Sequence, residues 1–355
     1  MASVIGHVDS RGDHVSATEL SSRFQEFLRA RSDDPESVHV TNAQALSGGW
    51  SRVMYTVTVE CQGAESKYVY RSDPDPIDIH FPTSRSEEWE VLTALDRLDT
   101  VSIPEPLWFD SDGKHFGRPA IVMAHVECES LLSMARRSEQ HAFPSMASRM
   151  AELLGSLHRV RPEQLPSRLG RYPNWDTYID SRIAQWLEAE RQGLAPDPFL
   201  RLVASWLDAN RPGPVPLGLV HGDFHPANVI VTSDDEYMAV DWELAHVGDP
   251  REDLGWMALA AEAQPPDLVG SDADNFYATY CKVAELPVEA IDEKALMYFL
   301  VLGSTDCYLG SLARLARLST GESRTVGSAY MAQVSPGMAR IIFNAMKRHD
   351  QLSRG

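Results

Sequence analysis

The chain has 355 residues, of which 43% are hydrophobic and 23% are charged, and its formal net charge is −19 at pH 7. Its length suffices for two lobes or domains with substantial cores, and the composition is ordinary for a soluble globular protein. The acidity excludes nucleic acid as an expected partner, because phosphate binding requires a positive surface. Taken alone, the acidity indicates no more than a soluble surface.

The cysteines and the first residues indicate the compartment. Four cysteines are scattered without a Cys-x-x-Cys pair, at Cys61, Cys128, Cys281 and Cys307. This pattern predicts reduced thiols and neither a disulfide framework nor a zinc site. Residues 1–12 lack the apolar segment of a secretory signal, and we identify no apolar run long enough to cross a membrane. We therefore expect a cytoplasmic protein with no membrane partner.

The first third of the chain has the pattern of a strand-rich lobe. Ser16 and Glu19 have the spacing of a capping box, which predicts a helix to about residue 31 that packs on the strands after it. Residues 85–98 have helical periodicity. Strands are predicted at residues 38–46, 53–60, 67–71, 107–109 and 119–126. Many strands with few helices predict a small α+β lobe that ends near Cys128.

A glycine-bearing turn joins the first two predicted strands and contains Gly48, Gly49 and Ser51. As an isolated feature it predicts an ordinary hairpin turn. In this position glycine would also allow the backbone to approach the phosphates of a nucleotide closely. Both interpretations are open from the residues alone.

The third predicted strand ends in a basic residue, Arg71. Because side chains alternate along a strand, Val69 and Arg71 share a face, so Arg71 could reach phosphates while Val69 lies under the nucleobase. A carboxylate of the helix at residues 85–98 could pair with Arg71 across the lobe. The alternative, a solvated cation at a sheet edge, has equal weight.

The rest of the chain is predicted to be mainly helical. Helices are expected at residues 145–158, 175–190, 199–210, 251–262, 272–284, 289–318 and 328–349. A proline-rich linker at residues 211–216 leads into the central motif. We therefore predict an N-terminal helical extension (1–37), a strand-rich N-lobe (38–127) and a helical C-lobe (128–355).

The chemically most informative residues come after that linker. An apolar run leads to His221, a glycine turn presents Asp223, and Asn228 comes five residues later. Two predicted strands joined by a turn then lead to Asp241. This layout places two carboxylates and an amide at the mouth of a two-stranded ribbon. Phosphoryl transfer uses such a set, with one carboxylate to orient a hydroxyl and an amide plus a carboxylate to hold Mg²⁺.

The same stretch permits a different chemistry. His221, Asp223, His225 and Asp241 could be the metal ligands of a phosphohydrolase. The amide of Asn228 argues against that interpretation, because asparagine is a poor ligand for transition metals and a good one for Mg²⁺. For His221 we favour a bracing role through a hydrogen bond to the backbone.

The turn and helix start after this stretch are also acidic. Asp253 could hydrogen-bond the catalytic loop, whereas Asp249 and Glu252 are expected only to favour the helix N-terminus. Between residues 251 and 294 ten acidic residues accompany three basic ones. We expect the acceptor site here, and the acidic excess would suit a cationic acceptor such as an aminocyclitol.

The stretches at residues 221–228 and 240–243 resemble the paired motif of the aminoglycoside phosphotransferase/choline kinase-like family. That family is a small-molecule branch of the protein-kinase-like fold, and the resemblance covers residues 38 to about 318. It implies a bilobal protein-kinase-like α+β fold with a small antiparallel-sheet N-lobe and a larger, mainly helical C-lobe. It also implies Mg²⁺ as cofactor and ATP or GTP as co-substrate.

The resemblance assigns roles to individual residues. Asp223 looks like the catalytic base that orients the acceptor hydroxyl, and Asn228 and Asp241 look like the Mg²⁺ ligands. Arg71 stands where kinases have a phosphate-binding lysine, and Glu88 resembles its helix partner. The other implied nucleotide-binding positions are in the flap, the third strand and the hinge: Gly48, Gly49, Ser51, Val69, Met123, His125 and Val126.

Two departures from the kinase pattern keep alternatives open. Position 71 has an arginine where kinases usually have a lysine. Arginine also neutralises phosphate and can bind it bidentately. The flap is shorter than the Gly-x-Gly-x-x-Gly of protein kinases. We predict an enzyme that transfers the γ-phosphoryl group of ATP or GTP to a hydroxyl of a small molecule. The alternatives are a nucleotide-binding pseudoenzyme or regulatory module and a metal-dependent phosphohydrolase.

Overall fold

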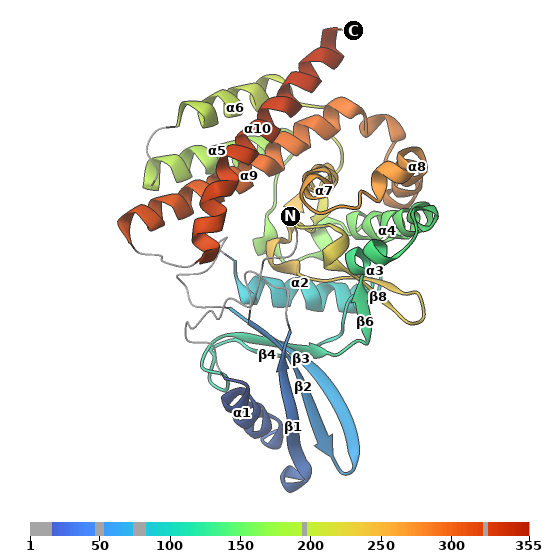
Figure 1. Cartoon of the computed structure of the whole chain (residues 1–355), viewed down its shortest axis with the longest axis vertical. Coiled ribbons are helices and arrows are strands. Elements are labelled where there is room, and N and C mark those ends of the chain that lie inside the picture. Colours follow the sequence, from blue (N-terminus) through green and yellow to red (C-terminus); the bar gives the residue numbers. More distant parts are fainter. Residues whose placement is uncertain (1–15, 47–52, 74–82, 194–196, 322–325, 355) are drawn as a thin grey trace.

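The protein has two unequal parts, as a computed structural model of the chain shows (Figure 1). The structure describes residues 16–46, 53–73, 83–193, 197–321 and 326–354. A sheet with one covering helix forms the smaller part, helices form the larger part, and helix α2 (Arg85–Leu98) lies between them (Figure 1). This is the predicted α+β arrangement.

The smaller part, the N-lobe, is built on an antiparallel sheet in the order β1-β2-β3-β5-β4. Its strands are β1 (Val38–Ala45), β2 (Val53–Cys61), β3 (Ala64–Ser72), β4 (Pro106–Asp110) and β5 (Ala120–Ala124). All five were predicted from the sequence. The last ends two residues earlier than expected, so His125 and Val126 come after the strand and begin the connection to the C-lobe.

Helix α1 (Ala17–Arg29) covers one face of this sheet (Figure 1). The Ser16 side chain accepts a hydrogen bond from the backbone N–H of Glu19, as the capping pattern predicts. Phe24 and Phe27 are buried against the sheet in one cluster with Val57 and Tyr70. Each fully buried side chain of this size stabilises the fold by about 1.5–3 kcal/mol, so α1 is part of the N-lobe core.

Helix α2 packs on the side of the sheet that faces the C-lobe. Its residues Val91, Leu92 and Leu95 share one buried cluster with Ile121 of β5 and Leu154 of the C-lobe. The core is therefore continuous between the two lobes, and α2 fixes their separation. The one buried carboxylate of α2, Glu88, lies near the end of β3.

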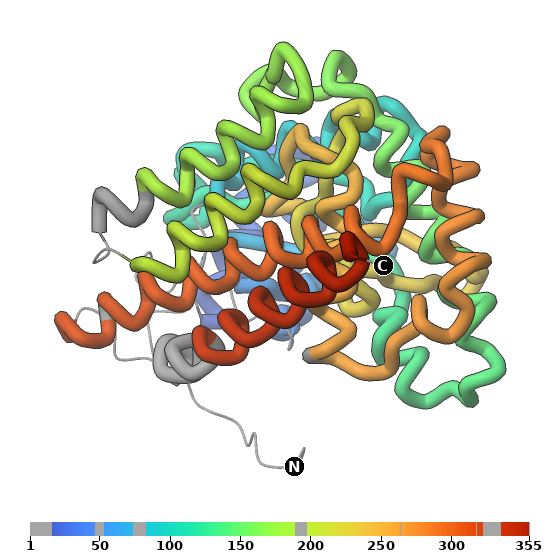
Figure 2. The backbone as a smooth tube through the Cα atoms, turned by 90° about the horizontal axis from the view of Figure 1, so that it is seen from above, coloured from blue at the N-terminus to red at the C-terminus, as the bar shows by residue number. Residues whose placement is uncertain are grey.

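In its described residues, the C-lobe contains the seven α-helices predicted from the sequence and one that was not. They are α3 (Leu131–Arg137), α4 (Phe143–His158), α5 (Trp175–Gly193), α6 (Pro198–Ala209), α7 (Arg251–Ala263), α8 (Ala273–Ala284), α9 (Glu293–Thr320) and α10 (Val326–Arg354). Helix α3 was missed because seven residues are too few to establish a helical period. Helices α5, α6, α9 and α10 run side by side (Figure 2) and bury a second apolar cluster.

Helix α9 corrects one expectation. By length and composition it could cross a membrane, with a mean hydropathy of 1.3 over its most apolar window. No such run was expected from the sequence, so that prediction was wrong for α9. Most of this window, 61%, is buried inside the protein, where Tyr298, Phe299 and Leu302 pack in the second cluster. The apolar composition of α9 is therefore that of a helix whose side chains pack against neighbouring helices in the core.

Among the described residues of the C-lobe, five short strands lie at its centre. They are β6 (Cys128–Ser130), β7 (Gly218–Val220), β8 (Val229–Thr232), β9 (Tyr237–Ala239) and β10 (His246–Gly248). The antiparallel pair of β8 and β9 is the predicted two-stranded ribbon. Strand β6 pairs with β8, and β7 pairs with β10. The short β6, β7 and β10 were not predicted, because three residues show no clear alternation.

Candidate active site

The loop after β7 makes a sharp turn at Gly222. Its φ of +82° lies in the left-handed region, and a Cβ there would stand 2.5 Å from the carbonyl oxygen of Leu244. Only glycine fits this position without displacement. The turn directs the next residue, Asp223, out of the C-lobe core and toward the ribbon.

A buried carboxylate from α7 holds this turn. Asp253 accepts hydrogen bonds from the backbone N–H groups of His221 (2.8 Å) and Gly222 (2.9 Å) and contacts Nε2 of His158 at 3.0 Å. Burial acts to raise the pKa of Asp253, but His158 and these donors outweigh it and lower the pKa. Asp253 is therefore an anion that fixes the loop backbone, and the prediction that it hydrogen-bonds the loop is confirmed.

His221 braces the loop from the other side. Its Nε2 lies 3.0 Å from the carbonyl oxygen of Val240, and its Nδ1 accepts from the backbone N–H of Asp223 at 3.3 Å. Burial lowers the pKa of His221 despite the nearby carboxylates. The two contacts therefore assign a neutral ring with the proton on Nε2. Both ring nitrogens bind backbone groups, which is the predicted bracing role.

Both oxygens of the Asp223 carboxylate are engaged. Oδ1 accepts from the indole Nε1–H of Trp256 at 2.6 Å and lies 3.2 Å from Nε2 of His225. Oδ2 accepts from the side-chain amide of Asn228 at 2.8 Å. The side chain is still 26% exposed, so a hydroxyl can reach it. No role was predicted for Trp256, although it stands three residues after Asp253 and so shares its helix face.

Asn228 is oriented by the same contacts. Its amide nitrogen donates to Oδ2 of Asp223 and, at 3.0 Å, to the Asp223 carbonyl oxygen. Both amide hydrogens are thereby used, which leaves the side-chain oxygen of Asn228 as an acceptor for another group. The Asn228 carbonyl also accepts from the backbone N–H of Val240 at 3.0 Å, which ties this residue to the end of the ribbon.

Asp241 stands directly after that point in an uncommon conformation. Its φ is +71° in the left-handed region, which a residue other than glycine adopts at a cost. The conformation turns the Asp241 carboxylate toward Arg71 of the N-lobe, with which it forms an ion pair. The site residues of the two lobes therefore meet here.

Arg71 lies almost fully buried, 3% exposed, at the end of β3. Its guanidinium pairs with Glu88 of α2 at 3.0 Å and with Glu243 at 3.0 Å, besides Asp241. Burial acts to lower the pKa of Arg71, and the charges of Asp241 and Glu243 outweigh it and raise the pKa. The expected pairing of Arg71 with a carboxylate of α2 is confirmed, and the partner is Glu88.

A second buried arginine joins this network. Arg85, the first residue of α2, pairs with Glu88 and, at 3.3 Å, with Glu243. Arg85 also pairs with Asp73 at 2.9 Å, so two guanidinium groups face four carboxylates where the lobes meet. Arg85 had no role in the sequence interpretation, although Glu88 stands three residues after it on one helix face.

The comparisons with known proteins identify the family. A model of the phosphotransferase enzyme family matches residues 42–287. The chain belongs to this family. No protein of curated function matches the sequence. The phosphotransferase family and its structural neighbours make the chain a small-molecule kinase, and the kinase-like fold predicted from the sequence is confirmed.

Solved structures share this fold over nearly the whole chain. A Ralstonia eutropha protein provisionally assigned as an aminoglycoside phosphotransferase has 17% identity and a TM-score of 0.68, and the match covers 92% of this chain and 98% of that one. Plasmodium vivax ethanolamine kinase has 13% identity, a TM-score of 0.62 and coverage of 96% and 94%. The choline kinase LicA of Streptococcus pneumoniae has 14% identity, a TM-score of 0.56 and coverage of 89% and 99%.

The predicted nucleotide positions of this phosphotransferase lie together where the structure describes them. Val69 and Met123 are direct cross-strand partners in the sheet, two residues from Arg71 on the same face. The backbone N–H of His125 donates to the Lys67 carbonyl at 3.3 Å, and Val126 comes next in the connection to the C-lobe. Gly48, Gly49 and Ser51 lie outside the described residues.

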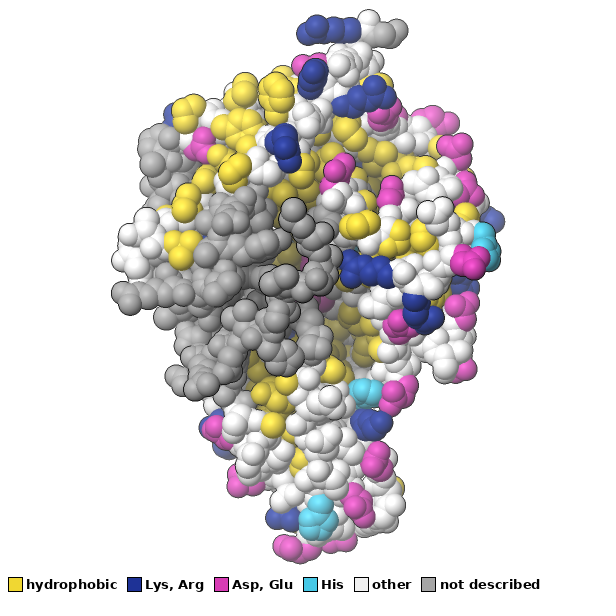
Figure 3. All heavy atoms as spheres, viewed as in Figure 1, with side chains coloured by type: hydrophobic (Ala, Val, Ile, Leu, Met, Phe, Trp, Pro, Cys, Tyr) yellow, Lys and Arg dark blue, Asp and Glu magenta, His cyan; other side chains and the backbone are white. Residues whose placement is uncertain are grey.

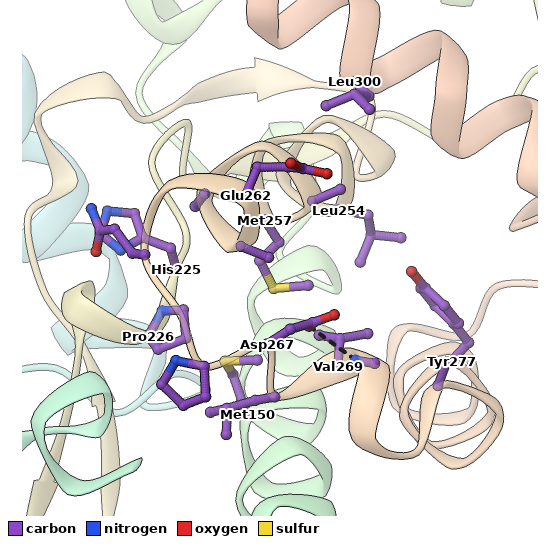
Figure 4. Close-up of a pocket in the computed structure, with 18 of the residues that line it drawn as sticks. Met150, His225, Pro226, Leu254, Met257, Glu262, Asp267, Val269, Tyr277 and Leu300 are labelled. Carbon is purple, nitrogen blue, oxygen red and sulfur yellow. Dashed lines mark hydrogen bonds between the residues drawn. The ribbon is translucent and has the colours of Figure 1, made fainter. Parts of the chain in front are cut away.

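Two cavities lie beside the phosphotransferase site in the C-lobe. One, of about 880 Å³, is bordered by Asp223, Trp256 and residues of α9 and α10. The other, of about 590 Å³, lies between α4, α7 and α8 and is shown in Figure 4. Among the ten acidic residues of positions 251–294, only Glu262 borders the first cavity within the described part of the chain. The acidic excess in the sequence is therefore mostly not at this cavity.

Two acidic side chains at the start of α7 have structural partners that correct the expectation from the sequence. Asp249 is fully buried, accepts from Nε1 of Trp175 at 2.6 Å and pairs with Arg251 at 2.7 Å. Glu252 is buried beside Arg182, at 3.3 Å. Both were expected only to favour a helix N-terminus. Instead they pair with arginines of the C-lobe, Asp249 with the buried Arg251 and Glu252 with the half-buried Arg182.

The geometry also bears on the metallohydrolase alternative. In the described residues no three His, Cys, Asp or Glu side chains converge as a metal-binding group. His221 has both ring nitrogens occupied by backbone atoms. The arrangement therefore fits the oxygen ligands of a phosphotransferase better than a histidine-rich metal centre.

Proposed function

We propose that this phosphotransferase moves the γ-phosphoryl group of ATP or GTP to a hydroxyl of a small molecule, with Mg²⁺ as cofactor, in the cytoplasm. The observation that carries the proposal is the convergence of Asp223, Asn228, Asp241 and Arg71 from separate segments. The solved choline kinase with AMP and an aminoglycoside phosphotransferase with ADP and hygromycin B support a nucleotide as co-substrate. We also propose the lobe boundaries predicted from the sequence, with residues 38–127 binding the nucleotide.

The role proposed for Asp223 is that of the catalytic base. Trp256 and Asn228 fix the carboxylate, so one geometry is presented to the acceptor and little reorganisation is needed. The acceptor oxygen forms a bond to the γ-phosphorus while the bond from that phosphorus to the β–γ bridging oxygen breaks. The hydroxyl proton passes to the Asp223 carboxylate, and ADP (or GDP) leaves.

The role proposed for Asn228 and Asp241 is that of cation ligands. The side-chain oxygen of Asn228 and the carboxylate of Asp241 are hard oxygen donors, which Mg²⁺ prefers. When bound, Mg²⁺ supplies positive charge that neutralises the triphosphate. The Arg71 guanidinium pairs with the Asp241 carboxylate and so holds it near the phosphate site.

The N-lobe is proposed to hold the nucleotide. Arg71 carries a permanent charge on a side chain fixed by Glu88, and its planar guanidinium suits phosphate oxygens. Val69, Met123, His125 and Val126 are proposed to lie against the base. The turn with Gly48, Gly49 and Ser51 is proposed to cover the phosphates.

The surface is consistent with a small-molecule partner and not with nucleic acid. On the face in Figure 3 the basic side chains are interspersed with acidic ones, and the described residues form no continuous basic tract there. The net charge of −19 adds to this argument. The acceptor is proposed to enter the 880 Å³ cavity that contains Asp223.

The proposed nucleotide chemistry predicts Mg²⁺-dependent stabilisation. We expect ATP with Mg²⁺ to raise the melting temperature, and Asp241→Ala to lose most of the Mg²⁺-dependent part, because that variant removes a cation ligand. The measurement is thermal unfolding with ATP, Mg²⁺ or both. Asp234→Asn, in the exposed turn before β9, is the control. Stabilisation by Zn²⁺ or Mn²⁺ without nucleotide would instead favour the hydrolase, and nucleotide binding without transfer to any acceptor would favour the pseudoenzyme.

Trp256 is predicted to be a positioning residue. Trp256→Phe keeps an aromatic ring in the cavity and deletes the Nε1–H that binds Asp223. A hydrogen bond to a charged group contributes about 1.5–3 kcal/mol, so we expect kcat to fall about tenfold or more with KM for ATP unchanged. Steady-state kinetics with a saturating acceptor measure this. A change in KM alone, with kcat intact, contradicts the assignment.

A further inference from the structure

The cavity that contains Asp223 has mainly apolar walls. Helix α7 contributes Trp256 and Leu259, α9 contributes Leu300, and α10 contributes Met338 and Ile341. An acceptor that is polar all round, such as a sugar, would leave its hydroxyls without partners along these walls, which costs free energy. The walls instead favour an acceptor with a substantial apolar surface.

The second cavity is also lined mainly by apolar residues. Met150, Leu254, Met257 and Tyr277 face one another around it, with His225 and Pro226 at its other side (Figure 4). Burial, with a smaller effect of Asp267, raises the pKa of Tyr277 to about 12, so its phenol is neutral at pH 7. Ala260, Met297 and Leu300 border both cavities, as do the polar side chains of His225, Glu262 and Gln264. The two cavities therefore adjoin, and apolar residues make up most of their lining.

The charges around the first cavity differ from those needed for a polycation. Besides Asp223 its border has one carboxylate, Glu262, and two arginines, Arg340 and Arg348. Arg348 is paired with Glu293 at 2.6 Å. Arg340 is exposed and has no ion pair within the part of the chain that the structure describes. A single carboxylate beside the base cannot neutralise several ammonium groups, whereas Arg340 can pair with an anion.

We propose that the acceptor is an amphipathic hydroxy acid, with its hydroxyl at Asp223, its carboxylate at Arg340 and its hydrocarbon chain extending into the 590 Å³ cavity. This inference rests on the proposed function and names its substrate class. The acceptor oxygen forms a bond to the γ-phosphorus of ATP, the bond from that phosphorus to the bridging oxygen breaks, and the hydroxyl proton passes to Asp223. The products are a phosphomonoester of the hydroxy acid, ADP and a proton.

The first test is transfer to matched acceptors by the full-length protein with Mg²⁺ and ATP. The acceptors are 3-hydroxydecanoate, its methyl ester, 3-hydroxybutyrate and the polycation kanamycin. Each buried CH₂ contributes about 0.8 kcal/mol, so 3-hydroxydecanoate should have a kcat/KM at least about a hundredfold above that of 3-hydroxybutyrate. A preference for 3-hydroxybutyrate or kanamycin overturns the inference and leaves the proposed function intact.

Two variants test the two ends of the acceptor. Arg340→Gln should raise KM for 3-hydroxydecanoate about five- to tenfold, and should leave KM for its methyl ester unchanged. Lys347→Gln removes a positive charge from the same helix at a position that borders neither cavity, and should have no effect. Ala258→Phe fills part of the 590 Å³ cavity. It should therefore raise KM for 3-hydroxydecanoate more than it raises KM for 3-hydroxybutyrate. Equal effects of Arg340→Gln and Lys347→Gln overturn the inference.

A binding measurement separates this inference from the proposed function. Calorimetry should show saturable binding of 3-hydroxydecanoate to the Asp223→Asn variant, whether or not the wild type transfers phosphate to it. Adding Arg340→Gln to that variant should weaken the binding. Absence of binding to a variant with the wild-type melting temperature overturns the substrate class. Binding without transfer by the wild-type protein would keep the substrate class and contradict the phosphotransferase mechanism.

Discussion

Asp223→Asn is expected to lower kcat about a thousandfold while the affinity for ATP with Mg²⁺ stays within about twofold. General base catalysis contributes roughly 10²–10⁴ in rate, and the amide cannot take the acceptor proton. The replacement has the same shape, and its oxygen can still accept from Trp256 or Asn228. The change therefore removes the base and keeps most of the surrounding structure. Product formation with a good acceptor and nucleotide binding by calorimetry measure the two effects.

The control for that variant is Asp234→Asn, which makes the same chemical change in the exposed turn between β8 and β9. It should leave kcat and the melting temperature unchanged. Transfer at the wild-type rate by Asp223→Asn would contradict the role of base. Loss of nucleotide binding together with transfer would instead indicate that Asp223 shapes the site for the cation.

The regular elements were largely predictable because they are long and amphipathic. Helix α2 begins and ends where its period predicts, since Ser84 caps its first turn and Val91, Leu92 and Leu95 share one face. The ribbon of β8 and β9 was predictable from two short apolar runs around a turn. Helix α3 and strands β6, β7 and β10 were not, because α3 is short and the strands pair with partners far away in the chain.

The site residues that are close in the sequence were predictable, but their partners from distant segments were not. The spacing of Asp223, Asn228 and Asp241 indicates their chemistry, because these residues lie within one loop and ribbon. The partners Arg85 and Trp256 come from other helices. Helical spacing places them on the faces of Glu88 and Asp253, but it does not show that those faces meet the loop. The expectation that acidic residues line the acceptor site was wrong as well, because composition does not show where a side chain points. Glu252 and Asp249 turn inward to arginines of the C-lobe, whereas the cavity beside Asp223 is mostly apolar.

Helix α7 links the fold to the chemistry through two side chains one turn apart. Trp256 binds the Asp223 carboxylate, and Asp253 binds the backbone that carries Asp223. Movement of α7 would therefore shift the base and its support together. Because α7 also borders both cavities, the acceptor site and the base are held by one rigid element.

Asp253→Asn is expected to destabilise the fold by about 3–5 kcal/mol, because the new amide N–H₂ cannot accept a hydrogen bond and leaves one of the two buried loop N–H donors unpaired. At roughly 2–4 °C per kcal/mol, the melting temperature should fall by about 6–20 °C. The protein that remains folded should also lose kcat, because the backbone on either side of Gly222 is released. Thermal unfolding and kinetics well below the new melting temperature measure the two effects. Asp274→Asn, in the first turn of α8, is the control.

The pH dependence of this effect comes from the lowered pKa of Asp253 in the folded protein, which the His158 contact and the loop N–H groups cause against the opposing effect of burial. A carboxylate with a lowered folded pKa contributes stability that is fully present above its unfolded pKa of about 3.9 and is lost as the pH falls through the folded value. The gap in melting temperature between the wild type and Asp253→Asn should therefore be constant from about pH 5 to 8 and shrink below about pH 4. A gap that persists unchanged at low pH would mean that Asp253 acts through shape alone, and the charge-based account of the loop would be wrong.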